Sequence, residues 1–273
     1  MKKGLTELVF IIDRSGSMGG LEDDTIGGFN SMLREQQEIA GEAVVTTVLF
    51  DDQYELLHDR INIQAVKPLT REEYAVRGST ALLDALGRTI HKIRKVQRNM
   101  KEEFRAEKVL FVIITDGHEN ASRRYTADMI RQRIEHQKKK YGWEFIFFGA
   151  NMDAVAEAEK IGIAADRAQN YSADAFGTHT AYETISGMTT AFRTDRSIGT
   201  VKSAEKQIEN EDQQSTGSAL IRMKEALEGI NEGIEEMKDF FHAAEVNGGK
   251  IPDVNEILRQ VLSEDHEGNA EIK

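Results

Sequence analysis

Apolar runs and amphipathic segments alternate along most of the chain. Residues 8–12 are five consecutive large apolar residues, and residues 109–115 form a second, mostly apolar run. Runs of this kind are typical of strands buried on both faces, as in the centre of a parallel sheet. The segment 81–98 instead carries its apolar residues at helical spacing. Strands and helices that alternate in this way predict a doubly wound α/β domain with right-handed crossovers.

The remaining segments complete this pattern. We expect further strands at 44–50, 53–58, 143–148 and 168–171, and further helices at about 25–39, 126–139, 153–160 and 175–193. Only Asp51 and Asp52 connect the second strand to the third, and parallel neighbours need a much longer crossover. The third strand is therefore expected to be antiparallel, at one edge of a mostly parallel sheet. A tight turn fully accounts for the two aspartates.

The composition changes after residue 193, so we expect the α/β domain to cover residues 1–193. Residues 194–217 are rich in Ser, Thr, Gln and acidic residues, which favours a linker. Apolar residues then recur at heptad spacing over 220–241, which predicts a helical hairpin or coiled-coil region over 218–262 and leaves 263–273 as a disordered tail. This apolar stripe either packs within the chain or supports self-association or the binding of another subunit.

Composition and charge exclude several classes of protein. The 273 residues carry a formal net charge of −12, which argues against a protein that binds nucleic acid by neutralising phosphates. The chain has no cysteine, which excludes disulfides, thiolate zinc sites and cysteine nucleophiles. Charged residues bracket the first apolar run, and no run reaches the length of a membrane span. We therefore expect a cytoplasmic protein that binds neither nucleic acid nor membranes.

Side chains that carry oxygen cluster where the buried strands are expected to end. Asp13, Ser15 and Ser17 follow the first apolar run at every second position, and Asp116 follows the run 109–115. Thr80 precedes the helix expected at 81–98. Open α/β sheets bind ligands at the carboxyl ends of their strands, where all five side chains can meet. Carboxylate and hydroxyl oxygens are ligands that Mg²⁺ prefers.

These residues resemble the metal-ion-dependent adhesion site of the von Willebrand factor A (vWA) domain family. Asp13, Ser15 and Ser17 match the family's Asp-x-Ser-x-Ser motif, Thr80 its separate threonine, and Asp116 its later aspartate. The resemblance covers roughly residues 7–193. It implies that the hydroxyls of Ser15, Ser17 and Thr80 touch Mg²⁺, or alternatively Mn²⁺, while the two aspartates act mainly through water.

The resemblance implies a metal-dependent protein-binding module of the intracellular bacterial type. Neutral hydroxyl ligands leave most of the cation's charge uncompensated, so that an open coordination position attracts an Asp or Glu carboxylate of a partner protein. We expect an adaptor in an intracellular assembly, for example beside an AAA+ ATPase, and not an enzyme, because no base is placed to activate a bound water. The alternatives are a metal-assisted hydrolase that uses the same site and a structural or assembly protein that acts through its C-terminal helices.

Residues around these positions have less definite interpretations. His118 and Glu119 follow Asp116 and either rim the site or lie in a solvated loop. Asp84, on the helix after Thr80, is either a residue that supports the site or a surface residue. Arg14 occupies a variable position of the motif and is expected to point outward. The other histidines have no ligand spacing, and we assign them no metal role.

Overall fold

A computed structural model of the protein describes residues 1–196. The predicted linker from residue 197 onward, the helical region at 218–262 with its stripe at 220–241, and the tail at 263–273 lie outside the described residues. Within residues 1–196, no helix is both long enough and apolar enough to span a membrane.

The core of the domain is one six-stranded sheet with the order β3-β2-β1-β4-β5-β6. The strands are β1 (Lys2–Asp13), β2 (Ala43–Phe50), β3 (Tyr54–Asn62), β4 (Ala106–Thr115), β5 (Glu144–Ala150) and β6 (Ala168–Tyr171). Edge strand β3 runs antiparallel to β2, and every other neighbouring pair is parallel. The prediction of a mostly parallel sheet with one antiparallel edge strand is confirmed.

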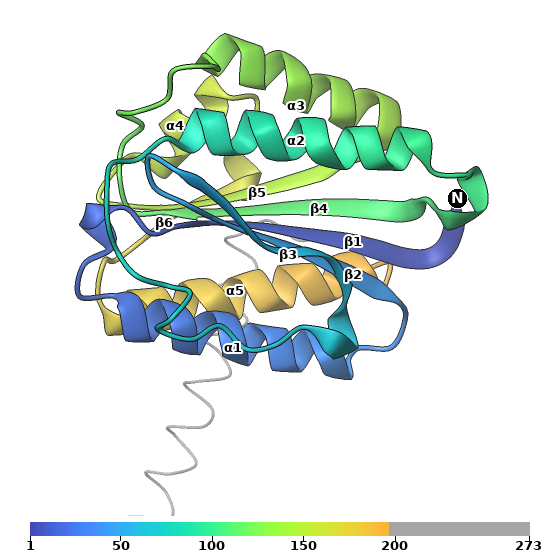
Figure 1. The fold of residues 1–273 in the computed structure, drawn as a ribbon, viewed down its shortest axis with the longest axis horizontal. Coiled ribbons are helices and arrows are strands. Elements are labelled where there is room, and N and C mark those ends of the chain that lie inside the picture. The colour runs from blue at the N-terminus through green and yellow to red at the C-terminus, as the bar shows by residue number, and fades with distance from the viewer. Residues whose placement is uncertain (197–273) are drawn as a thin grey trace, which may run out of the picture. The chain divides into compact units, whose positions relative to one another are not determined.

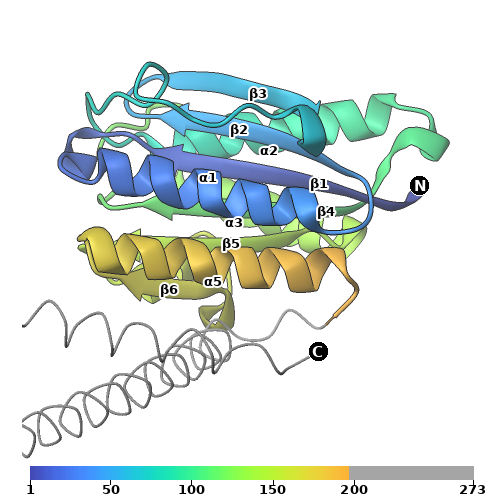
Figure 2. The same ribbon diagram turned by 90° about the horizontal axis from the view of Figure 1, so that it is seen from below.

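Helices cover both faces of the sheet (Figure 1). Helices α2 (Leu82–Asn99), α3 (Ala127–Tyr141) and α4 (Ala154–Lys160) lie on one face. Helices α1 (Glu22–Glu38) and α5 (Ala175–Arg193) lie side by side on the other face (Figure 2). This is the doubly wound arrangement that the alternation of strands and helices predicts.

Strand β1 is buried on both faces, as its apolar run predicts. Val9 and Ile11 belong to the core beneath α2 and α3, whereas Leu8, Phe10 and Ile12 belong to the core beneath α1 and α5. Successive side chains of a strand point to opposite faces, so one apolar run serves both cores. The loop that follows β1 therefore starts from a fixed position at the centre of the sheet.

The two central strands begin earlier than the sequence pattern predicts. Strand β1 begins at Lys2, which pairs with Ala106 of β4, whereas the apolar runs begin only at residues 8 and 109. The longer β1 places Glu7 inside the domain, where Arg60 Nε lies 2.7 Å from Glu7 Oε1. Burial raises the pKa of Glu7, and the guanidinium of Arg60 partly offsets that effect. The ion pair of Glu7 with Arg60 thus lies away from the carboxyl end of β1.

Helices α1 and α5 approach each other at a glycine. A Cβ atom added to Gly28 would lie 2.4 Å from Cδ2 of the buried Tyr182 ring, far inside van der Waals contact. The neighbouring Gly27 is exposed, and an added Cβ atom there would meet nothing within 4 Å. Close packing of the two helices therefore requires glycine only at position 28.

We predict opposite effects for alanine at these two adjacent positions. Gly28→Ala should lower the free energy of unfolding by about 1–3 kcal/mol, because the added methyl group overpacks the contact with Tyr182. Gly27→Ala should raise it by up to about 1 kcal/mol, because alanine favours the helix over glycine. Urea denaturation of both variants measures the difference. Equal effects would contradict the close approach of α1 to α5 at Gly28.

Candidate metal centre

The carboxylate of Asp13 is fixed at the point where β1 and β4 end beside each other. Asp13 is fully buried, and the backbone N–H of Ser15 donates a 2.7 Å hydrogen bond to its Oδ1 atom. The hydroxyl of Thr115 donates a 2.6 Å hydrogen bond to the Oδ2 atom. Burial raises the pKa of Asp13, and these two donors partly offset that effect. The contact from Thr115 is one that the motif comparison missed, although a threonine ending a buried run signals it.

Three hydroxyl groups meet next to Asp13. Ser15 Oγ lies 3.1 Å from Ser17 Oγ, and Thr80 Oγ1 donates a 2.9 Å hydrogen bond to Ser15 Oγ. A short 3₁₀ turn, Gly16–Met18, brings the two serines together. Ser15 and Thr80 are buried, whereas Ser17 is exposed. We call Ser15, Ser17 and Thr80 the hydroxyl cluster; it opens to solvent at Ser17.

Asp116 completes the set of predicted residues. Its Oδ2 atom accepts a 3.5 Å hydrogen bond from Asn151, whereas its buried Oδ1 atom has no hydrogen-bond partner among the described residues. Desolvation raises the pKa of Asp116, an effect that the Ser17 side chain partly offsets. The next residue is Gly117, where an added Cβ atom would lie 2.8 Å from Ser17 Oγ and 2.9 Å from Thr80 Oγ1. Only glycine lets the backbone after Asp116 approach the hydroxyl cluster this closely.

The donor atoms in this arrangement fit a divalent cation. All of the groups are hard oxygens, and a buried carboxylate oxygen without a partner is a costly feature that a cation would relieve. Residues 1–196 contain no group of three or more His, Asp or Glu side chains suited to hold a metal ion. A cation here would therefore depend on Ser15, Ser17 and Thr80, with Asp13 and Asp116 behind them.

The sequence comparison agrees with this geometry. The model of the von Willebrand factor type A domain matches residues 7–185, which is more than half of the chain. The chain belongs to this family. No curated protein matches the chain.

Solved structures similar to the vWA domain come from diverse sources. Proximal thread matrix protein 1 from the mussel byssus is 13% identical, with a TM-score of 0.48 and coverage of 68% of this chain and 46% of that chain. A mutant of the PilB minor pilin from Streptococcus sanguinis is 13% identical, with a TM-score of 0.48 and coverage of 68% and 61%. Manganese-loaded TRAP protein from Plasmodium vivax is 16% identical, with a TM-score of 0.39 and coverage of 55% and 58%. The match spans less than two thirds of each of these chains.

Asn120 holds Thr80 in place in the vWA domain. Thr80 N–H donates to Asn120 Oδ1 at 2.9 Å, and Thr80 O accepts hydrogen bonds from the N–H groups of Asn120 at 3.0 Å and Ala121 at 3.1 Å. The loop after β4 is thereby joined to the loop before α2. The sequence pattern gave no sign of this contact, because the two loops are 40 residues apart.

Three residues near the site, Glu119, Asp84 and His118, either have structural roles or lie exposed. Glu119 accepts hydrogen bonds from the backbone of Leu83 at 2.8 Å and of Ser122 at 2.7 Å, so its carboxylate is engaged by the first turn of α2 and by its own loop. Asp84 accepts hydrogen bonds from backbone N–H groups of residues 123–125. The side chain of His118 is 63% exposed, with Nδ1 3.7 Å from Glu157 Oε1.

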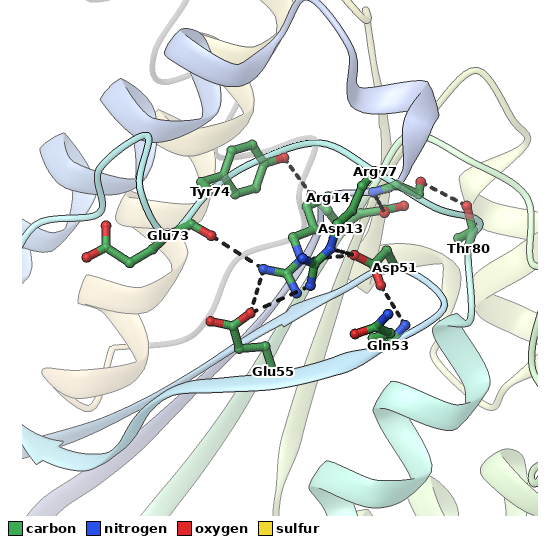
Figure 3. A network of polar contacts seen from close by, with 10 residues as sticks. Asp13, Arg14, Asp51, Gln53, Glu55, Glu73, Tyr74, Arg77 and Thr80 are labelled. Atoms are coloured by element: carbon green, nitrogen blue, oxygen red, sulfur yellow. Dashed lines mark hydrogen bonds and ion pairs between the residues drawn. The ribbon is translucent and has the colours of Figure 1, made fainter.

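The expectations for Arg14 and Asp51 are wrong. Arg14 is 2% exposed, and its Nε atom lies 3.2 Å from Asp51 Oδ2 (Figure 3). Its backbone N–H donates to Phe50 O at 2.8 Å, which extends the pairing of β1 with β2 past the end of the strand and keeps Arg14 inside. Asp51 accepts a hydrogen bond from Gln53 in the turn, but it is also fully buried and forms ion pairs with Arg14 and Arg77, so the turn does not fully account for it.

We predict that Asp116→Asn separates folding from cation binding. At about 100 times its dissociation constant, Mg²⁺ should stabilise the wild type by about 2.7 kcal/mol, and a tenfold weaker affinity would reduce this to about 1.4 kcal/mol. Without the cation the variant should be at least as stable as the wild type, because the charge whose burial raises the pKa of Asp116 is removed. Thermal unfolding with Mg²⁺ and with EDTA tests both parts. Full stabilisation of the variant by Mg²⁺ would rule out Asp116 as part of the centre.

Proposed function

We propose that the vWA domain binds a partner protein by capturing an Asp or Glu side chain at a divalent cation, with Mg²⁺ the first candidate and Mn²⁺ the second. The observation that carries the proposal is the hydroxyl cluster itself, in which three side chains from two separate loops meet beside the unpartnered oxygen of Asp116. When bound, the cation supplies a positive charge and an open coordination position for an anionic ligand.

The charges of the site favour an anionic partner group. Ser15, Ser17 and Thr80 contribute neutral oxygens, and both carboxylate oxygens of Asp13 are already hydrogen-bonded to Ser15 and Thr115. Of the two carboxylates, only Asp116 has an oxygen without a hydrogen bond from the described residues, so at most one carboxylate of the chain is in direct contact with the cation. A carboxylate of a partner protein would supply the missing negative charge, and the exposed Ser17 leaves the site accessible to it.

Several side chains near the site are unsuited to the alternative role of a hydrolase. Proton transfer needs a base within hydrogen-bond reach of the attacking water. Glu119 is engaged by backbone N–H groups and by the hydroxyl of Ser122, and His118 is directed towards Glu157. These contacts support a binding role over turnover. The wider proposal, an adaptor in an intracellular assembly such as one with an AAA+ ATPase, rests on the resemblance to intracellular vWA proteins.

We predict cation-dependent capture of a specific protein. Immobilised full-length chain should retain a partner from its native cell lysate with Mg²⁺, release it with EDTA, and fail to retain it when Asp13 is replaced by alanine. Asp128→Ala is the matched control, because Asp128 is an exposed carboxylate in the first turn of α3 that belongs to none of the contacts of the site. A replacement of the partner's own contacting Asp or Glu by its amide should abolish retention.

Two results would contradict this function. Retention of the same proteins by the wild type and by Asp13→Ala, with Mg²⁺ and with EDTA, would place recognition elsewhere on the chain. Retention that needs the cation but survives removal of every acidic side chain in the partner's binding region would exclude carboxylate capture.

A further inference from the structure

Asp51 is the buried centre of a charged network next to the hydroxyl cluster (Figure 3). Its Oδ2 atom lies 3.2 Å from Arg14 Nε and 2.8 Å from Arg77 Nε, and its Oδ1 atom accepts a 2.5 Å hydrogen bond from Gln53 N–H. Arg14 also lies 2.7 Å from Glu55 through Nη1. A turn between β2 and β3 needs only the contact with Gln53. The two guanidinium contacts therefore require another explanation.

The network joins the two loops that supply the hydroxyl cluster. Arg14 lies between Asp13 and Ser15 in the sequence, and Arg77 lies three residues before Thr80. Both arginines reach the same carboxylate oxygen of Asp51. The side chain of Asp51, which directly follows β2, thus fixes the loop after β1 and the loop before α2 relative to each other.

Backbone hydrogen bonds join the same two loops and the end of β2. Arg77 N–H donates to Arg14 O at 2.9 Å, and Ala81 N–H donates to Asp51 O at 3.0 Å. Gly16 N–H donates to Gly78 O at 3.1 Å. Thr80 is therefore flanked on both sides by contacts to the network or to the serine loop.

The backbone conformation of the loop before α2 also limits which residue can occupy position 78. Gly78 has a φ of +67°, and an added Cβ atom would lie 2.1 Å from Asp52 Oδ1. The positive φ favours glycine, and the Cβ atom of any other residue would displace the carboxylate of Asp52. Glycine at this position allows Arg77 and Thr80 to lie close to Asp51 and Ser15, respectively.

We propose that Arg14 and Arg77, acting through Asp51, are positioning residues that set the separation of the Thr80 hydroxyl from those of Ser15 and Ser17, and thereby the affinity for the divalent cation. The proposal rests on the proposed function only in requiring that the hydroxyl cluster binds a cation. Residues that orient metal ligands through hydrogen bonds typically change metal affinity by about 10-fold to 100-fold when replaced. A network that served stability alone would change unfolding but leave the affinity of the folded protein unaltered.

Arg77 provides the first test, because its side chain is 50% exposed and its replacement should leave the fold intact. Arg77→Met removes the contact with Asp51 and should weaken Mn²⁺ binding, measured by titration calorimetry on the folded full-length chain, by about tenfold or more. Arg71→Met is the matched control. Arg71 lies in the same loop and pairs with Asp23 at 2.5 Å, but neither residue contacts the network or the hydroxyl cluster. The dissociation constant of Arg71→Met for Mn²⁺ should equal that of the wild type.

Arg14 provides the second test through a conservative change. Arg14→Lys keeps the charge near Asp51 but loses the planar fork that reaches Asp51 and Glu55 together. This variant should fold and bind Mn²⁺ more weakly than the wild type. Arg60→Lys is its control, because it alters the buried pair with Glu7 of β1, which lies away from the carboxyl end of that strand. The control should lower the melting temperature without changing the dissociation constant.

The outcomes separate this inference from the proposed function. Equal Mn²⁺ affinity in the wild type, Arg77→Met and Arg14→Lys would overturn the positioning role and leave the proposed function intact. Equal weakening by Arg71→Met or Arg60→Lys would also overturn it, because the effect would then follow general destabilisation. A wild type that binds no Mn²⁺ would overturn both. A wild type that binds Mn²⁺ but captures no carboxylate would overturn the proposed function alone.

Discussion

The position of the Asp13 carboxylate is the constraint on which the rest of this edge depends. It lies at the end of β1, which is buried on both faces, and receives hydrogen bonds from the loop that follows β1 and from the end of β4. The hydroxyl of Tyr74 donates to the backbone oxygen of the same residue at 2.6 Å, which adds the loop before α2. Three segments that are far apart in the sequence are thus joined at one residue. The hydroxyl cluster is assembled around this point.

The way in which buried carboxylates are neutralised distinguishes the site from the rest of the domain. Glu7 is paired with Arg60, and Asp51 is paired with Arg14 and Arg77. Asp13 and Asp116 have no cationic partner among the described residues and are contacted only by neutral donors. Buried charges without a partner are costly, and here burial raises the pKa of both groups. The unpaired carboxylates of Asp13 and Asp116 therefore indicate a cation site at the same position as the sequence motif, and they do so without reference to the motif.

The sequence predicted those parts of the structure that depend on local pattern. The apolar runs gave β1 and β4, and the polar residues directly after them gave Asp13 and Asp116, because the ends of neighbouring parallel strands share one edge. The burial of Arg14 could not be predicted in this way. Its partner Asp51 lies 37 residues away, and nothing in the local sequence distinguishes a paired arginine from an exposed one.

Two smaller omissions have a different cause. Thr115 and Gly117 adjoin the predicted Asp116, and each has a feature that sequence reasoning could have used. A threonine that ends a buried apolar run has a hydroxyl in need of a partner, and Asp13 provides it. A glycine directly after a metal-site aspartate suggests close approach of the backbone, and the distances from its added Cβ atom to Ser17 and Thr80 show that approach.

The pattern of exposure around the hydroxyl cluster determines how a partner would reach it. Ser15 and Thr80 are buried, so access from the sheet and from α2 is closed. Gly16, Ser17 and Asn151 are exposed, and they come from the loops after β1 and β5. A partner side chain would therefore approach between these two loops, beyond the carboxyl ends of the strands. The buried side of the cluster is fixed by Asp13 and by the Arg14–Asp51–Arg77 network, so partner specificity would reside in the residues that surround Ser17 on the exposed side.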